Sequence, residues 1–134
     1  MAKLEAIEGI GEVYAEKLRA AGIRSTNDLL KKAGTRQGRK ALAEASGISE
    51  TLILEWVNHA DLFRIKGIGP EYADLLEEAG VDTVPELAQR NPENLYAKII
   101  EVNNAKKLVR RLPTLDMVKE WVAQAKSLPR AIEY

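Results

Sequence analysis

One segment of this chain occurs twice, and the repeat limits the possible folds more than any other feature of the sequence. The segment "IEGIGEVYAEKLRAAGI" at residues 7–23 returns 58 positions later as "IKGIGPEYADLLEEAGV" at residues 65–81. A second match, "LEWVNHA" at 54–60 with "KEWVAQA" at 119–125, has an offset of 65. We interpret the chain as two copies of one unit, residues 1–63 and 64–134, with seven extra residues in the second copy between Leu87 and Lys119.

The spacing of apolar residues predicts helices in both copies. Tyr14, Leu18 and Ala21 share one face of a helix, and the second copy repeats this spacing from Tyr72 onward. Helix ends are predicted at Gly22 and Gly80, and helix N-caps at Ser25, Ser49, Thr83, Asn91 and Thr114. Trp56 and Trp121 are predicted core anchors. No stretch alternates as a strand does, so we predict an all-α fold whose two copies pack together as one compact domain.

Two glycines, one residue apart, precede a helix in each copy. Glycine allows the sharp chain reversal between two helices, so a purely structural role would explain the pattern. A helix N-terminus also presents unpaired N–H groups and the positive end of the helix dipole to an anion, such as a phosphate. The residues predicted to contact phosphate around the two "GIG" segments are Gly9, Ile10, Gly11, Lys66, Gly67, Ile68 and Gly69.

The order hydrophobic-x-Gly-hydrophobic-Gly, with Ala15 or Ala73 four residues on, resembles the helix-hairpin-helix motif. The whole chain is similar to uncharacterised tandem helix-hairpin-helix proteins, a "domain of unknown function" class, through "GRKALAEASGISETLILEWVNHADLFRIKGIG" and "DTVPELAQRNPENLYAKI". The tract "AGIRSTNDLL" resembles part of the C-terminal domain of the RNA polymerase α-subunit, and DNA-repair helix-hairpin-helix domains are more distantly similar. The resemblance implies duplicated helix-hairpin-helix units that bind DNA or other proteins.

Basic residues gather in two stretches, although the chain has 20 basic and 20 acidic residues and no net charge. The stretch "AKKLVRRL" is predicted to be helical, with its cations toward solvent. Two interpretations remain open for both stretches: a solvated face, or a patch that follows a phosphate backbone. The cations concerned are Lys31, Lys32, Arg36, Arg39 and Lys40 in the first stretch, and Lys106, Lys107, Arg110 and Arg111 in the second.

Carboxylates weigh against tight binding of DNA at either "GIG" segment. Glu12 and Glu71 follow the glycines, where a cation would suit a phosphate better. The first hypothesis is therefore a non-enzymatic protein that binds DNA weakly, independently of sequence and with strong salt sensitivity. The alternative is a protein-interaction or scaffold module that uses the hairpins only structurally.

The sequence contains few residues suited to catalysis or metal binding. It has no cysteine, and His59 is its single histidine. "GIGEVYA" fits a dinucleotide-binding pattern, but no strand precedes it. We expect no enzyme activity, cofactor, metal or small-molecule substrate. No apolar run would span a membrane and no secretory leader is recognisable, so we expect a cytoplasmic protein without membrane partners.

Overall fold

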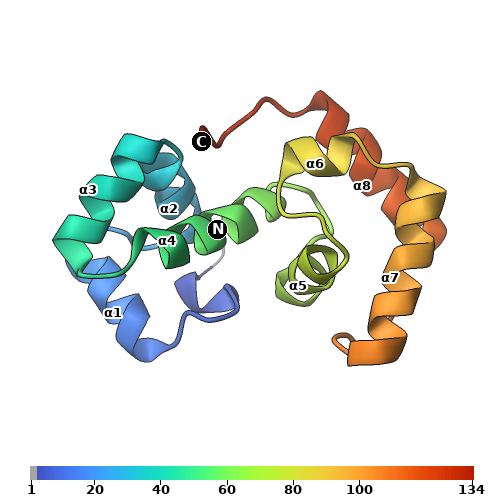
Figure 1. Ribbon diagram of the computed structural model, residues 1–134, viewed down its shortest axis with the longest axis horizontal. Coiled ribbons are helices and arrows are strands. Elements are labelled where there is room, and N and C mark those ends of the chain that lie inside the picture. The colour runs from blue at the N-terminus through green and yellow to red at the C-terminus, as the bar shows by residue number, and fades with distance from the viewer. Residues whose placement is uncertain (1–2) are drawn as a thin grey trace. The chain divides into compact units, whose positions relative to one another are not determined.

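The computed structural model describes residues 3–134, and these are helical along most of their length (Figure 1). No strand occurs among them, so the predicted all-α fold is confirmed. A short 3-10 helix, η1, opens the described chain at Leu4–Ala6. The α-helices are α1 (Glu12–Ala20), α2 (Thr26–Ala33), α3 (Arg36–Ser46), α4 (Glu50–Leu62), α5 (Pro70–Glu78), α6 (Val84–Ala88), α7 (Pro92–Lys106) and α8 (Leu115–Ser127). Within residues 3–134, no helix is long and apolar enough to cross a membrane.

The proximity of residues in space divides the chain into two compact units. Unit 1 comprises Met1–Asp61 together with Arg130–Tyr134, and unit 2 comprises Leu62–Pro129. Met1 and Ala2 of the predicted first copy lie outside the described residues. The last five residues were predicted within the second copy, whereas their contacts group them with unit 1.

Each unit is built around one tryptophan. Trp56 of α4 and Trp121 of α8 are both buried, as predicted for core anchors. Tyr14 meets the ring of Trp56 with centroids 5.1 Å apart, and Tyr72 meets Trp121 at 5.3 Å. Offset and edge contacts of this kind add to the apolar area that an aromatic residue buries. The same aromatic pair therefore joins the first turn of α1 to α4 and that of α5 to α8.

The predicted helix ends are confirmed. Gly22 and Gly80 have φ angles of 92° and 93°. The amides of Ile23 and Val81 reach back to the carbonyls of Leu18 and Leu76, at 2.9 and 2.8 Å. These bonds close a Schellman motif at the end of α1 and of α5. The side chains of the predicted N-caps Ser25, Ser49, Thr83, Asn91 and Thr114 each accept a backbone N–H of the following helix.

The stretch "AKKLVRRL" is not the helix that its apolar spacing predicted. Helix α7 ends at Lys106, and Lys107 takes a left-handed φ of 52°. Beyond this turn, the side chain of Asn103 accepts the N–H of Val109 at 3.0 Å. This bond holds Val109 against the last turn of α7. Residues 107–114, called the basic loop below, therefore connect α7 to α8 without helical structure.

Candidate functional site

The first glycine of each "GIG" segment is required by the backbone. We call residues 7–11 the first hairpin and residues 65–69 the second hairpin. In each, a four-residue turn is closed by an N–H···O bond of 3.1 Å, from Ile10 to Ile7 and from Ile68 to Ile65. The third residue of each turn is glycine, with φ angles of 94° and 98°, in the region that glycine favours. Ile10 and Ile68 are buried, so each turn is also anchored by its apolar residue.

The second glycine of each segment is not required in this way. Gly11 and Gly69 have φ angles of −88° and −105°, which other residues also adopt. A Cβ added at either position would meet no atom within 4 Å. The fold therefore leaves room for a larger residue at both positions.

Gly11 and Gly69 are the N-caps of α1 and α5, and they differ from the other N-caps of the described chain. The six remaining α-helices begin with a Ser, Thr or Asn side chain that accepts a backbone N–H. Glycine has no such acceptor, so α1 and α5 offer the amides of their first turn to an acceptor from outside. Pro70, the first residue of α5, removes one N–H that would have no partner in the helix.

The second hairpin opens onto a hollow of about 360 Å³. Its lining includes Gly67, Gly69 and Tyr72. The hydroxyl of Tyr72 donates to the carbonyl of Arg111 at 3.0 Å, which holds the basic loop beside the first turn of α5. At the other end of this helix, Lys106 pairs with Glu78. The segment from Lys106 to Arg111 therefore runs along α5 and ends near the second hairpin.

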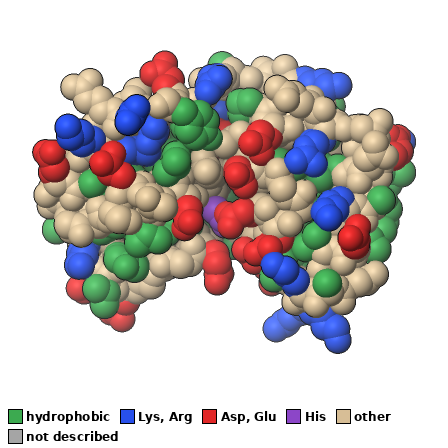
Figure 2. Space-filling view, viewed as in Figure 1, with side chains coloured by type: hydrophobic (Ala, Val, Ile, Leu, Met, Phe, Trp, Pro, Cys, Tyr) green, Lys and Arg blue, Asp and Glu red, His purple; other side chains and the backbone are tan. Residues whose placement is uncertain are grey.

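Lys66 and the basic loop contribute exposed cations to the same part of unit 2. Lys66 is exposed, and its backbone is held by Gln124, whose side chain accepts the Lys66 N–H at 2.9 Å and donates to the Lys66 carbonyl at 3.2 Å. Figure 2 shows lysine and arginine side chains gathered at the end of unit 2 where α7 ends in Figure 1. The exposed cations of this segment are Lys106, Lys107, Arg110 and Arg111.

The basic stretch of unit 1 is placed differently. The ammonium group of Lys32 donates to the carbonyl of Gly22 at 3.2 Å, beyond the C-terminal end of α1. Helix α1 has nine residues, so this contact lies about 13 Å from the helix end that carries the first hairpin. Lys31, Arg36 and Lys40 are exposed on α2 and α3. None of these cations has a contact that ties it to the first hairpin in the described structure.

Arg39 does not belong to an exposed basic patch, and that prediction is wrong. Its side chain is 5% exposed. The guanidinium donates to the carbonyls of Ala33, Gly34 and Glu133, at 3.2, 3.1 and 2.8 Å. Burying a charged group is costly unless it is hydrogen-bonded, and these three carbonyls satisfy it within the protein. Arg39 is thereby removed from the candidate phosphate ligands.

Two carboxylates flank the glycines of the first hairpin, and a third precedes it. Glu8 and Glu12 flank its glycines and are exposed. Glu5, just before the hairpin, accepts a 2.7 Å bond from Arg19, and this bond lowers the pKa of the Glu5 carboxyl below its usual value. Val13, in the first turn of α1, is 67% exposed. The first hairpin therefore presents acidic and apolar side chains, whereas the second presents cations together with one carboxylate, Glu71.

A family model described as "Domain of unknown function (DUF4332)" matches residues 8–128. The chain belongs to this family. The predicted membership of a class of unknown function is confirmed at this level, while the kinship with helix-hairpin-helix domains and with RNA polymerase stays a prediction. No curated protein and no solved structure matches the chain. The DUF4332 match takes in the glycines of both hairpins and the basic loop, and residues 129–134 lie beyond it.

Two positioning residues of this DUF4332 chain were not predicted as part of the site. Tyr72 was assigned to the apolar face of its helix, and its hydroxyl partner lies 39 residues away. Gln124 occupies the position in the second copy that His59 has in the first. The offset of 65 residues between the two copies was the one sequence signal that pointed to Gln124. His59 itself is buried within α4. Among residues 3–134, no three His, Asp or Glu side chains are grouped as metal ligands would be.

Proposed function

We propose that this DUF4332 protein is a non-enzymatic nucleic-acid-binding protein that holds duplex DNA by its backbone, with each "GIG" turn acting as a helix-hairpin-helix motif. The second hairpin is the principal contact. One observation carries the proposal: the uncapped N-terminus of α5, where Gly69 leaves open space, lies beside the cationic loop that Tyr72 holds in place. Amides and cations in one location are the combination that recognises phosphate.

The chemistry of the second hairpin favours contacts that do not depend on base sequence. A phosphate oxygen would accept the N–H groups in the first turn of α5, and Lys66, Arg110 and Arg111 would neutralise its neighbours along the strand. Tyr72 packs against Trp121, so its ring is already engaged in the core. Without a base-reading or base-stacking group, the contact reads the backbone alone.

Charge limits the expected affinity. The chain has no net charge, and Glu71 lies in the first turn of α5 beside the proposed phosphate site. A carboxylate about 4 Å from a phosphate charge costs about 1 kcal/mol even in water. Binding is therefore expected to be weak and to fall steeply as salt concentration rises.

The decisive substitution is Gly69→Asp. An aspartate is a favourable N-cap, so the change should preserve or raise the stability of α5 while its carboxylate occupies the phosphate site. Asn91→Asp is the matched control, because it adds the same charge at the exposed, already capped N-terminus of α7 in the same unit. Fluorescence anisotropy with a labelled duplex of about 20 base pairs should show at least about tenfold weaker binding for Gly69→Asp than for the control. Equal affinities for the two variants would contradict the proposed site.

The basic loop is tested by Arg110→Gln with Arg111→Gln, against Lys126→Gln as a control for an exposed cation of α8 in the same unit. Titrations at about 50 mM and about 200 mM salt give the slope that counts neutralised phosphates. The loop variant should bind more weakly and with a shallower slope, while Lys126→Gln should behave as the wild type. Absence of any binding at the lower salt concentration would overturn the nucleic-acid proposal.

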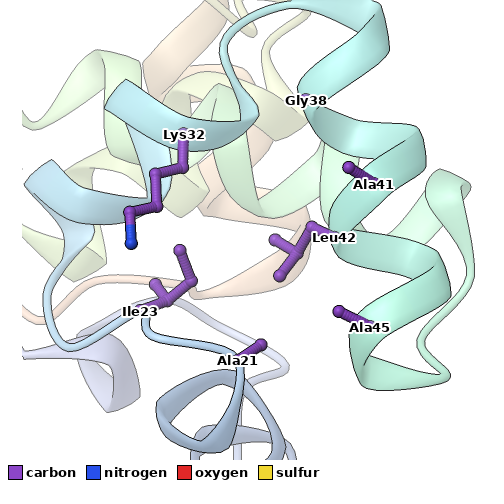
Figure 3. Close-up of a pocket in the computed structure, with 7 residues that line it drawn as sticks. All are labelled: Ala21, Ile23, Lys32, Gly38, Ala41, Leu42 and Ala45. Atoms are coloured by element: carbon purple, nitrogen blue, oxygen red, sulfur yellow. The ribbon is translucent and has the colours of Figure 1, made fainter.

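A protein-interaction module is the second candidate function, and unit 1 supplies the observations that favour it. Val13 is exposed beside Glu8 and Glu12 at the first hairpin. A separate apolar hollow of about 240 Å³ lies in unit 1. Figure 3 shows Ile23 and Leu42 facing one another there, with Lys32 at the edge. The first feature suits a partner with apolar side chains and some basic charge, and the second suits apolar side chains. Loss of DNA binding at low salt would leave this candidate in place.

A further inference from the structure

The last five residues of the chain, Arg130–Tyr134, lie as an extended segment on unit 1, although the helix that precedes them belongs to unit 2 (Figure 1). Their backbone is bound at both polar groups of Glu133. The N–H of Glu133 donates to the carbonyl of Gly34 at 2.7 Å, and the carbonyl of Glu133 accepts from Arg39 at 2.8 Å. These two contacts recognise an extended backbone rather than the Glu133 side chain.

Two side chains of this segment are also recognised. Ile132 is 2% exposed, so it is fully inserted into unit 1. The hydroxyl of Tyr134 donates to the side chain of Asn58 at 3.0 Å. The Tyr134 ring lies 5.9 Å from the guanidinium of Arg39 and 5.7 Å from that of Arg130, within the range of a cation–π contact. The surface of unit 1 therefore selects an apolar residue followed, two positions later, by a tyrosine.

The surface of unit 1 that binds the segment contains an arginine that unit 2 lacks at the equivalent helix position. Arg39 is the fourth residue after the N-cap Thr35, and the fourth residue after the N-cap Asn91 of α7 is Leu95, which is buried. An arginine thus stands where the other unit has an apolar residue, and Glu133 supplies one of its three acceptors. A Cβ on Gly34 would lie 2.6 Å from the carbonyl oxygen of Leu30 and 2.7 Å from that of Ala131, so both the end of α2 and the close approach of the segment require glycine here.

We propose that this surface is a peptide-binding groove and that its partner is the Arg130–Tyr134 segment of a second copy of the chain. Apart from the contact between Arg130 and Tyr134, which lies within the segment, the contacts above join this segment to the rest of unit 1. Only Leu128 and Pro129 separate the segment from the end of α8. The same contacts therefore form between two copies without any new chemistry. Each copy has one segment and one groove, so mutual exchange closes a symmetric dimer.

Two full-length variants separate the groove from the segment. Arg39→Leu removes the groove contact while placing in α3 the residue that α7 carries at the same position. Ile132→Asp disables the segment and leaves the groove intact. Each variant alone should remain monomeric by light scattering, whereas their mixture should form a one-to-one dimer with a single exchanged segment. Arg39→Leu mixed with the double variant should form none. Absence of the one-to-one dimer at protein concentrations on the order of 1 mM would overturn the proposal.

A labelled peptide of sequence RAIEY provides a second measurement that does not depend on dimer formation. It should bind the Ile132→Asp chain, whose groove is vacated, at least about tenfold more tightly than the Arg39→Leu chain. The peptide RADEY should bind the Ile132→Asp chain as weakly as RAIEY binds the Arg39→Leu chain. Circular dichroism checks that both chains keep their helices. Equal binding of RAIEY to the two folded chains would show that Arg39 forms no recognition groove and would overturn the proposal.

Discussion

The two units share their backbone devices and differ in what surrounds the hairpins. In both, a glycine of positive φ closes the hairpin turn, a tyrosine–tryptophan pair braces it, and a Schellman motif ends the next helix. The carbonyl of the glycine that follows this helix also accepts a hydrogen bond from a basic side chain in both units. Lys32 donates to Gly22, and Arg90 donates to Gly80. These shared features are sufficient to form the hairpin, so they say nothing of a ligand.

The differences concern charge and the third helix of each unit. Helix α3 has 11 residues and ends at a left-handed glycine, Gly47, whereas α7 has 15 and ends at a left-handed lysine, Lys107. The longer helix and the basic loop that follows bring cations along α5. The described residues of unit 1 include no such loop, and carboxylates flank the hairpin of this unit. The comparison teaches that the glycine motif specifies a turn, and that the neighbouring segment decides which ligand the turn suits.

The largest expected effect tests whether both units depend on their tryptophan. Trp56→Ala and Trp121→Ala should each lower the free energy of unfolding by about 3–5 kcal/mol, because each removes a buried aromatic side chain and leaves a cavity. Urea denaturation followed by far-ultraviolet circular dichroism measures the loss. Trp→Phe at the same positions should cost less. A loss below about 1 kcal/mol at one position would break the equivalence of the units.

The next effect separates the two glycines of one hairpin. Gly67→Ala should lower the free energy of unfolding by about 1–3 kcal/mol, because alanine is strained at a φ of 98°. Its Cβ would also lie 3.2 Å from Trp121 Nε1. Gly69→Ala should cost less than this, since its φ is negative and its Cβ position is open. Gly9 and Gly11 should reproduce the contrast in unit 1. Equal costs for Gly67→Ala and Gly69→Ala in thermal unfolding would contradict it.

Sequence alone predicted the parts of the fold that depend on local interactions. The N-caps at Ser25 and Thr83 and the helix ends at Gly22 and Gly80 involve partners within a few residues, so spacing and residue type were sufficient. One local detail differs from a capping box, in which the side chain three residues after the N-cap accepts the N–H of the N-cap itself. The carboxylates of Asp28 and Glu86 accept the amide of the residue before the N-cap rather than that of the N-cap itself.

The arrangement of the candidate site depends on contacts between distant residues, and these were not predictable from one sequence. Arg39 is buried because its acceptors include Glu133, 94 residues away. The basic loop was predicted as helix because its apolar spacing is helical, and lysine gives no signal for the left-handed conformation that Lys107 adopts. The proximity of this loop to the second hairpin rests on the bond between Tyr72 and Arg111. Composition and periodicity do not encode such pairings.

A smaller effect tests how the basic loop is held beside the second hairpin. Tyr72→Phe keeps the ring contact with Trp121 and removes the bond to the Arg111 carbonyl, which is exposed. We expect a loss of about 0.5–1.5 kcal/mol in the free energy of unfolding, toward the lower end, and weaker binding of duplex DNA. Tyr14→Phe is the matched control in unit 1, where no basic loop accompanies the hairpin. If the Tyr72→Phe variant binds DNA as tightly as the wild type, the Tyr72 hydroxyl has no role in positioning the basic loop for binding.

The smallest effect concerns the ion pair between Glu5, which precedes the first hairpin, and Arg19 in the last turn of α1. Arg19 lowers the pKa of Glu5 from its usual 4.5, so the carboxylate is favoured in the folded state. This stabilising contribution is complete at pH values above 4.5 and is lost as pH falls through the lower pKa of the folded protein. Glu5→Gln should therefore have a slightly lower urea midpoint than the wild type at about pH 7, and the difference should shrink in acid. Because the pair is exposed, salt should also reduce the difference. A difference that persists unchanged below both pKa values would show that Glu5 stabilises this end of α1 by packing rather than by charge.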